Sequence, residues 1–122
     1  MSCEPHDVNS ESSDTRFWAV VSDLLGSGKC VSLKPLGGSM KPFIWPGDTV
    51  VIDPCDWRRL RFGDIVLCKT AVQADSNAMR IHRIMKIDGE NGQRRIHTRG
   101  DASGKMDEPI VPQYILGKVT EP

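Results

Sequence analysis

Short apolar runs separated by glycine turns dominate this chain from residue 31 onward. The longest run covers 79–87, and the turn Asp88-Gly89-Glu90-Asn91-Gly92 then leads into a second run, as in a β-hairpin. The strands predicted in this way cover 31–33, 49–52, 65–68, 79–87, 94–98 and 114–119. Many short strands with glycine turns predict a mainly β, barrel-like domain over residues 29–122.

A helical period precedes these strands. Apolar side chains at Phe17, Trp18, Val21, Leu24 and Leu25 form one stripe, and Gly26-Ser27-Gly28 ends it. The pattern predicts one short amphipathic helix over 14–28 that packs on the sheet. The alternative is that residues 15–25 dock on a membrane surface or on a partner. The polar stretch 1–13 predicts a disordered leader.

Length and charge narrow the function classes. The chain has 122 residues, enough for one domain but not for two. Its 16 Lys and Arg balance its 16 Asp and Glu, so it lacks the basic excess of a nucleic-acid-binding protein. Near the N-terminus, the longest apolar stretch, 17–21, is too short to cross a bilayer. We therefore expect no nucleic-acid partner and no transmembrane segment.

The cysteines indicate the compartment. Cys3, Cys30, Cys55 and Cys68 form no Cys-x-x-Cys pair and no zinc-ligand spacing. The chain also shows no basic-then-apolar signal segment. These features predict reduced thiols in the cytoplasm and no metal site.

Candidate chemistry begins at Ser39, which follows Gly37 and Gly38 and precedes Met40-Lys41-Pro42. Two glycines allow a tight turn and let a substrate approach the backbone closely. A serine nucleophile needs that exposure, and its own amide can help to bind an oxyanion. A Gly-Gly-Ser turn alone is also a common structural turn, so the serine needs partners.

Histidine and carboxylate candidates follow in the chain. His82 lies in the apolar run 79–87, and an imidazole can accept the proton of a serine near neutral pH. Asp101 in Arg99-Gly100-Asp101-Ala102 supplies a carboxylate that would fix the histidine tautomer. Asp48 and Asp64 follow glycines in tight turns and are expected to be structural.

Six motifs occur in a characteristic order. They are Gly38-Ser39-Met40-x-Pro42, Pro46-Gly47-Asp48-x-Val50, Gly63-Asp64-Ile65-Val66, His82-Arg83-Ile84, Gly100-Asp101-Ala102 and Ile115-Leu116-Gly117-Lys118-Val119. With this succession the chain resembles the signal peptidase I and SOS-repressor superfamily of serine peptidases over residues 31–119. The resemblance implies the largely antiparallel, coiled β-barrel catalytic domain of that superfamily.

The resemblance also implies roles for residues. Bacterial signal peptidases and the self-cleaving repressors use a lysine base, whereas the endoplasmic-reticulum-type and archaeal enzymes place a histidine there, as His82 is placed here. It implies Ser39 as nucleophile and Asp101 as orienting acid, with Asp107 where a second acid is usual. Gly38 and Met40 would line the substrate site, although a core methionine is equally compatible with the sequence.

Two residues compete for the role of base. Lys86 is four positions after His82, so both would face the same side of a regular strand, and a buried lysine can act as a base. His97 fits the motif less well and is expected to be structural. The family position favours His82 over both.

The sequence therefore predicts a serine endopeptidase that cleaves an extended peptide or protein segment with small residues before the scissile bond, without a metal or cofactor. It departs from the family in having no membrane anchor, no N-terminal DNA-binding domain and no Ala-Gly self-cleavage pair upstream of Ser39. Two alternatives stay open: a non-catalytic peptide-binding or maturation partner that kept the fold, and a leaderless signal peptidase that meets the membrane through residues 15–25.

Overall fold

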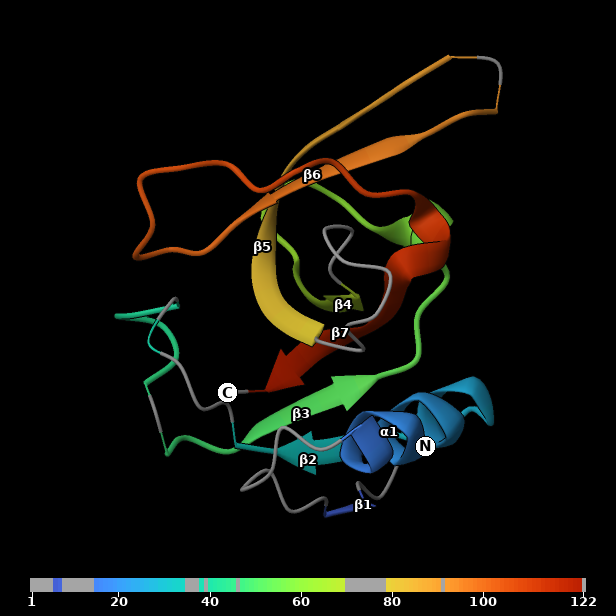
Figure 1. The fold of residues 1–122 in the computed structure, drawn as a ribbon, viewed down its shortest axis with the longest axis vertical. Helices are drawn as coiled ribbons and strands as arrows, with labels where there is room; N and C mark the ends of the chain where they lie inside the picture. Colours follow the sequence, from blue (N-terminus) through green and yellow to red (C-terminus); the bar gives the residue numbers. More distant parts are fainter. Residues whose placement is uncertain are drawn as a thin grey trace.

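The computed structural model describes residues 6–7, 15–34, 38, 40–45, 47–69, 79–90 and 92–121. One α-helix and seven strands make up most of this part of the chain (Figure 1). The elements are β1 (His6–Asp7), α1 (Thr15–Gly26), β2 (Val31–Leu33), β3 (Val50–Asp53), the 3₁₀ turn η1 (Trp57–Arg59), β4 (Ile65–Lys69), β5 (Met79–Asp88), β6 (Arg95–Arg99), the 3₁₀ turn η2 (Pro112–Tyr114) and β7 (Ile115–Glu121).

The strands form one sheet in the order β1-β2-β3-β7-β4-β5-β6. All neighbours pair antiparallel except β1, which runs parallel to β2. The mainly β class is confirmed. The expected barrel is not formed, because β1 and β6 are the two ends of the sheet in the described part of the chain and do not pair with each other.

The strand predictions agree closely with the structure, including the hairpin between β5 and β6. Gly89 supplies the backbone that this hairpin requires. Its φ is +115°, and a Cβ built on it would lie 1.9 Å from the carbonyl oxygen of Gln93, so only glycine fits. The turn aspartates also behave as expected: Asp48 accepts from the amide of Trp45, and Asp64 accepts from the amide of Arg61.

Two clusters of buried side chains cover the two faces of the sheet. One contains Val21 and Leu25 of α1 together with Leu67 and Ile81, so the helix packs on the sheet as predicted. The second contains Val66 and Ile84, among others. Since Ile81 and Ile84 are an odd number of positions apart on β5, the clusters lie on opposite faces.

Two N-terminal predictions are corrected. The segment 1–13 was expected to be a disordered leader, but His6–Asp7 within it form β1; the remainder of the segment lies outside the described residues.

Cys30 is disulfide-bonded, so the expectation of four reduced thiols is wrong at this position, while Cys55 and Cys68 are free thiols. Since disulfides persist in oxidising compartments, the thiol argument for the cytoplasm does not apply to Cys30.

Within the described ranges, no helix is both long and apolar enough to cross a membrane.

Candidate active site

His82 and Asp107 form the central pair of the candidate site. His82 Nδ1 lies 2.5 Å from Asp107 Oδ2, and the two side chains are only 12% and 13% exposed. An ionised carboxylate only accepts hydrogen bonds, so Nδ1 carries the proton in this contact. A neutral imidazole held in this way presents Nε2 as its acceptor, which is the form that a general base needs.

The backbone beside β6 brings Asp107 to this position. The Asp107 amide donates to the carbonyl of Thr98 at 2.9 Å, and Ile110 exchanges both backbone hydrogen bonds with Ile96. The Thr98 hydroxyl, which is fully buried, donates to Asp107 Oδ2 at 2.8 Å. Two hydrogen bonds from neighbouring elements therefore fix the carboxylate that contacts His82.

Arg80 and Cys68 complete the surroundings of this pair. Arg80 lies two positions before His82 on the same face of β5, and its Nε is 3.6 Å from Asp107 Oδ2. Burial raises the pKa of the Cys68 thiol to about 11, against the opposing effect of the Arg80 charge. Cys68 therefore stays a neutral thiol at physiological pH and is no competitor for the role of nucleophile.

Asp101 is not the acid that contacts His82, contrary to the sequence prediction. Its two carboxylate oxygens accept from Nε and Nη2 of Arg83, each at 2.8 Å. The physical reason is strand alternation: Arg83, and not His82, points toward the turn that carries Asp101. The carboxylate that contacts His82 is instead that of Asp107, which the sequence offered as a second acid.

Gly38 and Met40 flank Ser39, which itself lies outside the described residues. Met40 is 3% exposed and belongs to the cluster with Ile81, so it is a core side chain. Its Sδ accepts from the Asp101 amide at 3.4 Å. The segment that follows the predicted nucleophile is thus packed against the Asp101 turn.

The two competing bases are paired across neighbouring strands, Lys86 on β5 and His97 on β6. Lys86 is 65% exposed and pairs with Asp88 at 3.5 Å. The pairing register with β6 shifts between Ile84 and Lys86, which breaks the alternation that would have placed Lys86 beside His82. His97 contacts both oxygens of Asp88 at 3.2 Å, and this hydrogen bond is the main reason why the pKa of Asp88 is lowered.

Sequence reasoning missed Arg83, Thr98 and Arg80 as members of this site. A signal existed for Arg83, which directly follows His82, and for Arg80, which precedes it by two positions on the same strand face. Thr98 had no comparable signal, since its role depends on the path of the segment that returns beside β6.

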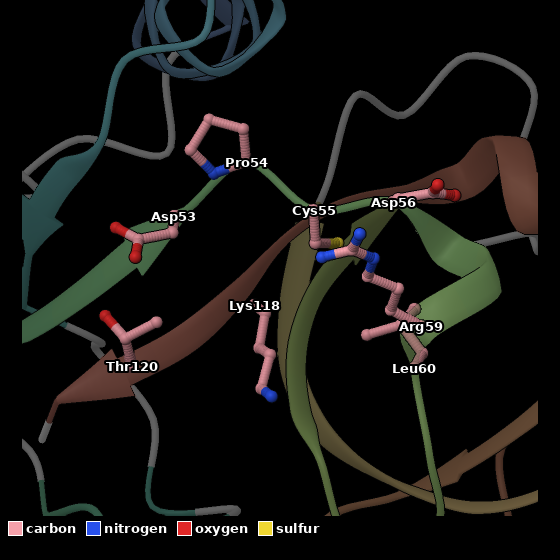
Figure 2. A pocket seen from close by; sticks show the side chains of 8 residues that line it. All are labelled: Asp53, Pro54, Cys55, Asp56, Arg59, Leu60, Lys118 and Thr120. Carbon is pink, nitrogen blue, oxygen red and sulfur yellow. The ribbon is translucent and has the colours of Figure 1, made fainter. Parts of the chain in front are cut away.

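A pocket of about 460 Å³ opens between the end of β3, η1 and β7 (Figure 2). Cys55, Arg59 and Lys118 are among its lining residues, and none of the predicted site residues lines it. Lys118 pairs with Val66, which pairs in turn with His82, so the pocket lies on the His82 face of the sheet, two strands away. Burial raises the pKa of the Cys55 thiol, so this cysteine is also neutral at physiological pH.

Comparisons with protein-family models, with curated proteins and with solved structures found no match to this chain.

Proposed function

We propose that this protein is a serine endopeptidase of the signal-peptidase-like kind, with Ser39 as nucleophile, His82 as general base and Asp107 as orienting acid. The observation that carries the proposal is the hydrogen bond between His82 Nδ1 and Asp107. A histidine and a carboxylate this close, both largely buried, match the base and acid of a Ser-His-Asp site. The motif order around Ser39 supports the assignment of the nucleophile.

The proposed reaction has two halves. Ser39 Oγ attacks the peptide carbonyl while His82 Nε2 takes the hydroxyl proton, and Asp107 stabilises the imidazolium that forms. The carbon–nitrogen bond then breaks as His82 returns the proton to the leaving amine. A water molecule, activated by the same histidine, hydrolyses the acyl ester and restores Ser39.

The superfamily's catalytic-domain fold and its substrate class belong to the same proposal. The substrate would be an extended peptide segment with small residues before the scissile bond, and it could bind by adding a strand beside the site. Peripheral membrane contact through residues 15–25 is proposed with it. Among the described side chains of α1, Val21 and Leu25 are buried, whereas Val20 is half-exposed and could take part in such contact.

A second candidate is a non-catalytic peptide-binding module. Phe43 and Trp45 come shortly after Ser39, and their side chains are 65% and 50% exposed. Exposed aromatic side chains on one loop are typical of binding surfaces. A binding module would use this loop without needing a reactive serine.

Reaction with an alkyl fluorophosphonate, followed by intact-mass and peptide mapping, separates the two candidates. The wild type should gain one adduct, and that adduct should map to Ser39. Ser39→Ala should remain unlabelled, and His82→Ala should label at least ~100-fold more slowly, because a general base contributes about 10²–10⁴-fold.

His97→Ala is the matched control, since His97 is also a strand histidine paired with an aspartate. It should label as the wild type does. Equal labelling of His82→Ala and wild type would contradict the role of His82. Absence of any adduct on folded wild type, combined with retained binding of extended peptides, would favour the binding module.

A further inference from the structure

One guanidinium joins three separate loops next to the candidate site. Arg83 Nε and Nη2 donate to the two carboxylate oxygens of Asp101, each at 2.8 Å, and Nη1 donates to the Gly63 carbonyl at 2.7 Å. The Arg83 Cζ also lies 4.6 Å from the centre of the Phe43 ring. Each contacting loop comes from a different part of the chain, and Arg83 is what they share.

These contacts use the full geometry of an arginine. A bidentate pair with a carboxylate, a third bond in the same plane and a stacked ring together require a planar, five-donor group. The Arg83 and Asp101 side chains are only 21% and 14% exposed, so water screens their charges less than it would at the surface. A lysine could reproduce the charge but not this set of contacts.

The loop that follows Ser39 is attached to Arg83 in two ways. The first is direct, through the Phe43 ring. The second passes through Asp101, whose amide donates to Met40 Sδ. The loop is also tightened internally, because the amides of Phe43 and Ile44 both donate to the Met40 carbonyl at 2.9 Å.

Arg83 directly follows His82, and the two side chains leave β5 on opposite faces. Arg83 therefore does not compete for the carboxylate that holds His82, since Asp107 lies on the other face. Any displacement of the Met40–Phe43 loop would be a displacement relative to the same stretch of backbone that carries the proposed base.

We propose that Arg83 is a positioning residue that clamps the Met40–Phe43 loop, the Gly63 turn and the Asp101 turn onto β5, next to the backbone that carries His82. The reactivity of Ser39 in this inference rests on the proposed function, whereas the clamping of the loops does not. Its experiment therefore has two readouts.

The first readout is fluorophosphonate labelling of Ser39 in Arg83→Met, which keeps the stem but removes the guanidinium. The maximal labelling rate should fall roughly 10- to 100-fold, because a small misplacement of reacting groups costs about that much. The half-saturating probe concentration and the pH dependence should not change, since His82 and Asp107 keep their contacts. The exposed Arg95 of β6 gives the matched control, and Arg95→Met should label as the wild type does.

The second readout is amide hydrogen exchange of residues 40, 41, 43–45 and 100–103, which needs no activity. Arg83→Met should exchange at least ~10-fold faster at these amides, since local opening governs exchange. Arg83→Lys, the milder change, should give an intermediate exchange rate. It replaces Arg83→Met in the experiment if that variant does not fold. Arg95→Met should leave the exchange of these loops unchanged.

Unchanged exchange of both loops in Arg83→Met and Arg83→Lys would overturn the clamp. Faster exchange with an unchanged maximal labelling rate would overturn the positioning role. An unlabelled wild type whose loops loosen in Arg83→Met would count against the proposed peptidase and would leave the clamp supported.

Discussion

The two faces of β5 hold carboxylates in different ways. His82 on one face contacts Asp107, which also accepts from the buried Thr98 hydroxyl. Arg83 on the other face binds Asp101 bidentately and reaches two further loops. One pair has the geometry of proton transfer, and the other has that of a permanent ion pair. The comparison teaches that consecutive residues of one motif can bind different carboxylates, because a strand directs them to opposite sides.

The sharpest test of this division is the replacement of each carboxylate by its amide. Asp107→Asn should lower the rate of Ser39 labelling by roughly 10³–10⁴-fold, since an amide no longer enforces the required histidine tautomer. Asp101→Asn should lower it far less. Fluorophosphonate kinetics on the two purified variants measure the difference. Equal losses of labelling rate in the two variants would show that Asp101 supports the reaction as much as Asp107 does.

Asp101→Asn should also lower the stability of the fold. Asp101→Asn weakens two charge-assisted hydrogen bonds to Arg83 and leaves the guanidinium without its counter-charge. We expect a loss of about 1–3 kcal/mol in the free energy of unfolding. Urea unfolding of Asp101→Asn and of the wild type measures this loss. A variant at Asp101 as stable as the wild type would contradict the clamp.

The buried thiol on the His82 face predicts a pH effect. The pKa of Cys68 is raised from 9.0 to about 11 in the folded protein. Above about pH 9 the unfolded chain loses this proton before the folded chain does, so stability falls as the pH rises from 9 to 11.

At about pH 10.5 this effect should cost the wild type about 2 kcal/mol relative to neutral pH. Cys68→Ala should lack that part of the alkaline loss, although it is less stable overall because it leaves a cavity. Urea unfolding of both proteins at the two pH values isolates the difference. Parallel alkaline losses would show that the thiol ionises as readily in the folded state.

The smallest expected effect concerns the hydroxyl that supports Asp107. Thr98→Val keeps the shape of the side chain but removes the donor to Asp107 Oδ2. We expect a loss of about 1 kcal/mol in stability. Labelling should fall less than in Asp107→Asn, because the histidine contact remains. A labelling loss as large as that of Asp107→Asn would mean that Thr98, and not the histidine contact, keeps the carboxylate in place.

Local patterns predicted the secondary structure well for a clear reason. The run 65–68 is apolar and follows the Gly63 turn, and 79–87 carries regularly placed Ile and Met side chains before the Gly89 turn, so their strands follow from local preferences and from the need to bury side chains. The helix at Thr15–Gly26 likewise follows from its apolar stripe. The closure of the sheet depends on pairing between distant strands, which no local pattern encodes.

The sequence alone determined the strands, the helix and the candidate histidine, because each depends on residues adjacent in the chain. The tertiary structure alone decided which acid His82 contacts. That choice depends on the path of residues 107–110 beside β6 and on Arg83 occupying Asp101. It also decided that Lys86 points away, through a shift in pairing register that only the neighbouring strand imposes. Contacts between residues distant in sequence are set by packing and pairing, so the carboxylate partner of His82 became visible only in the folded chain.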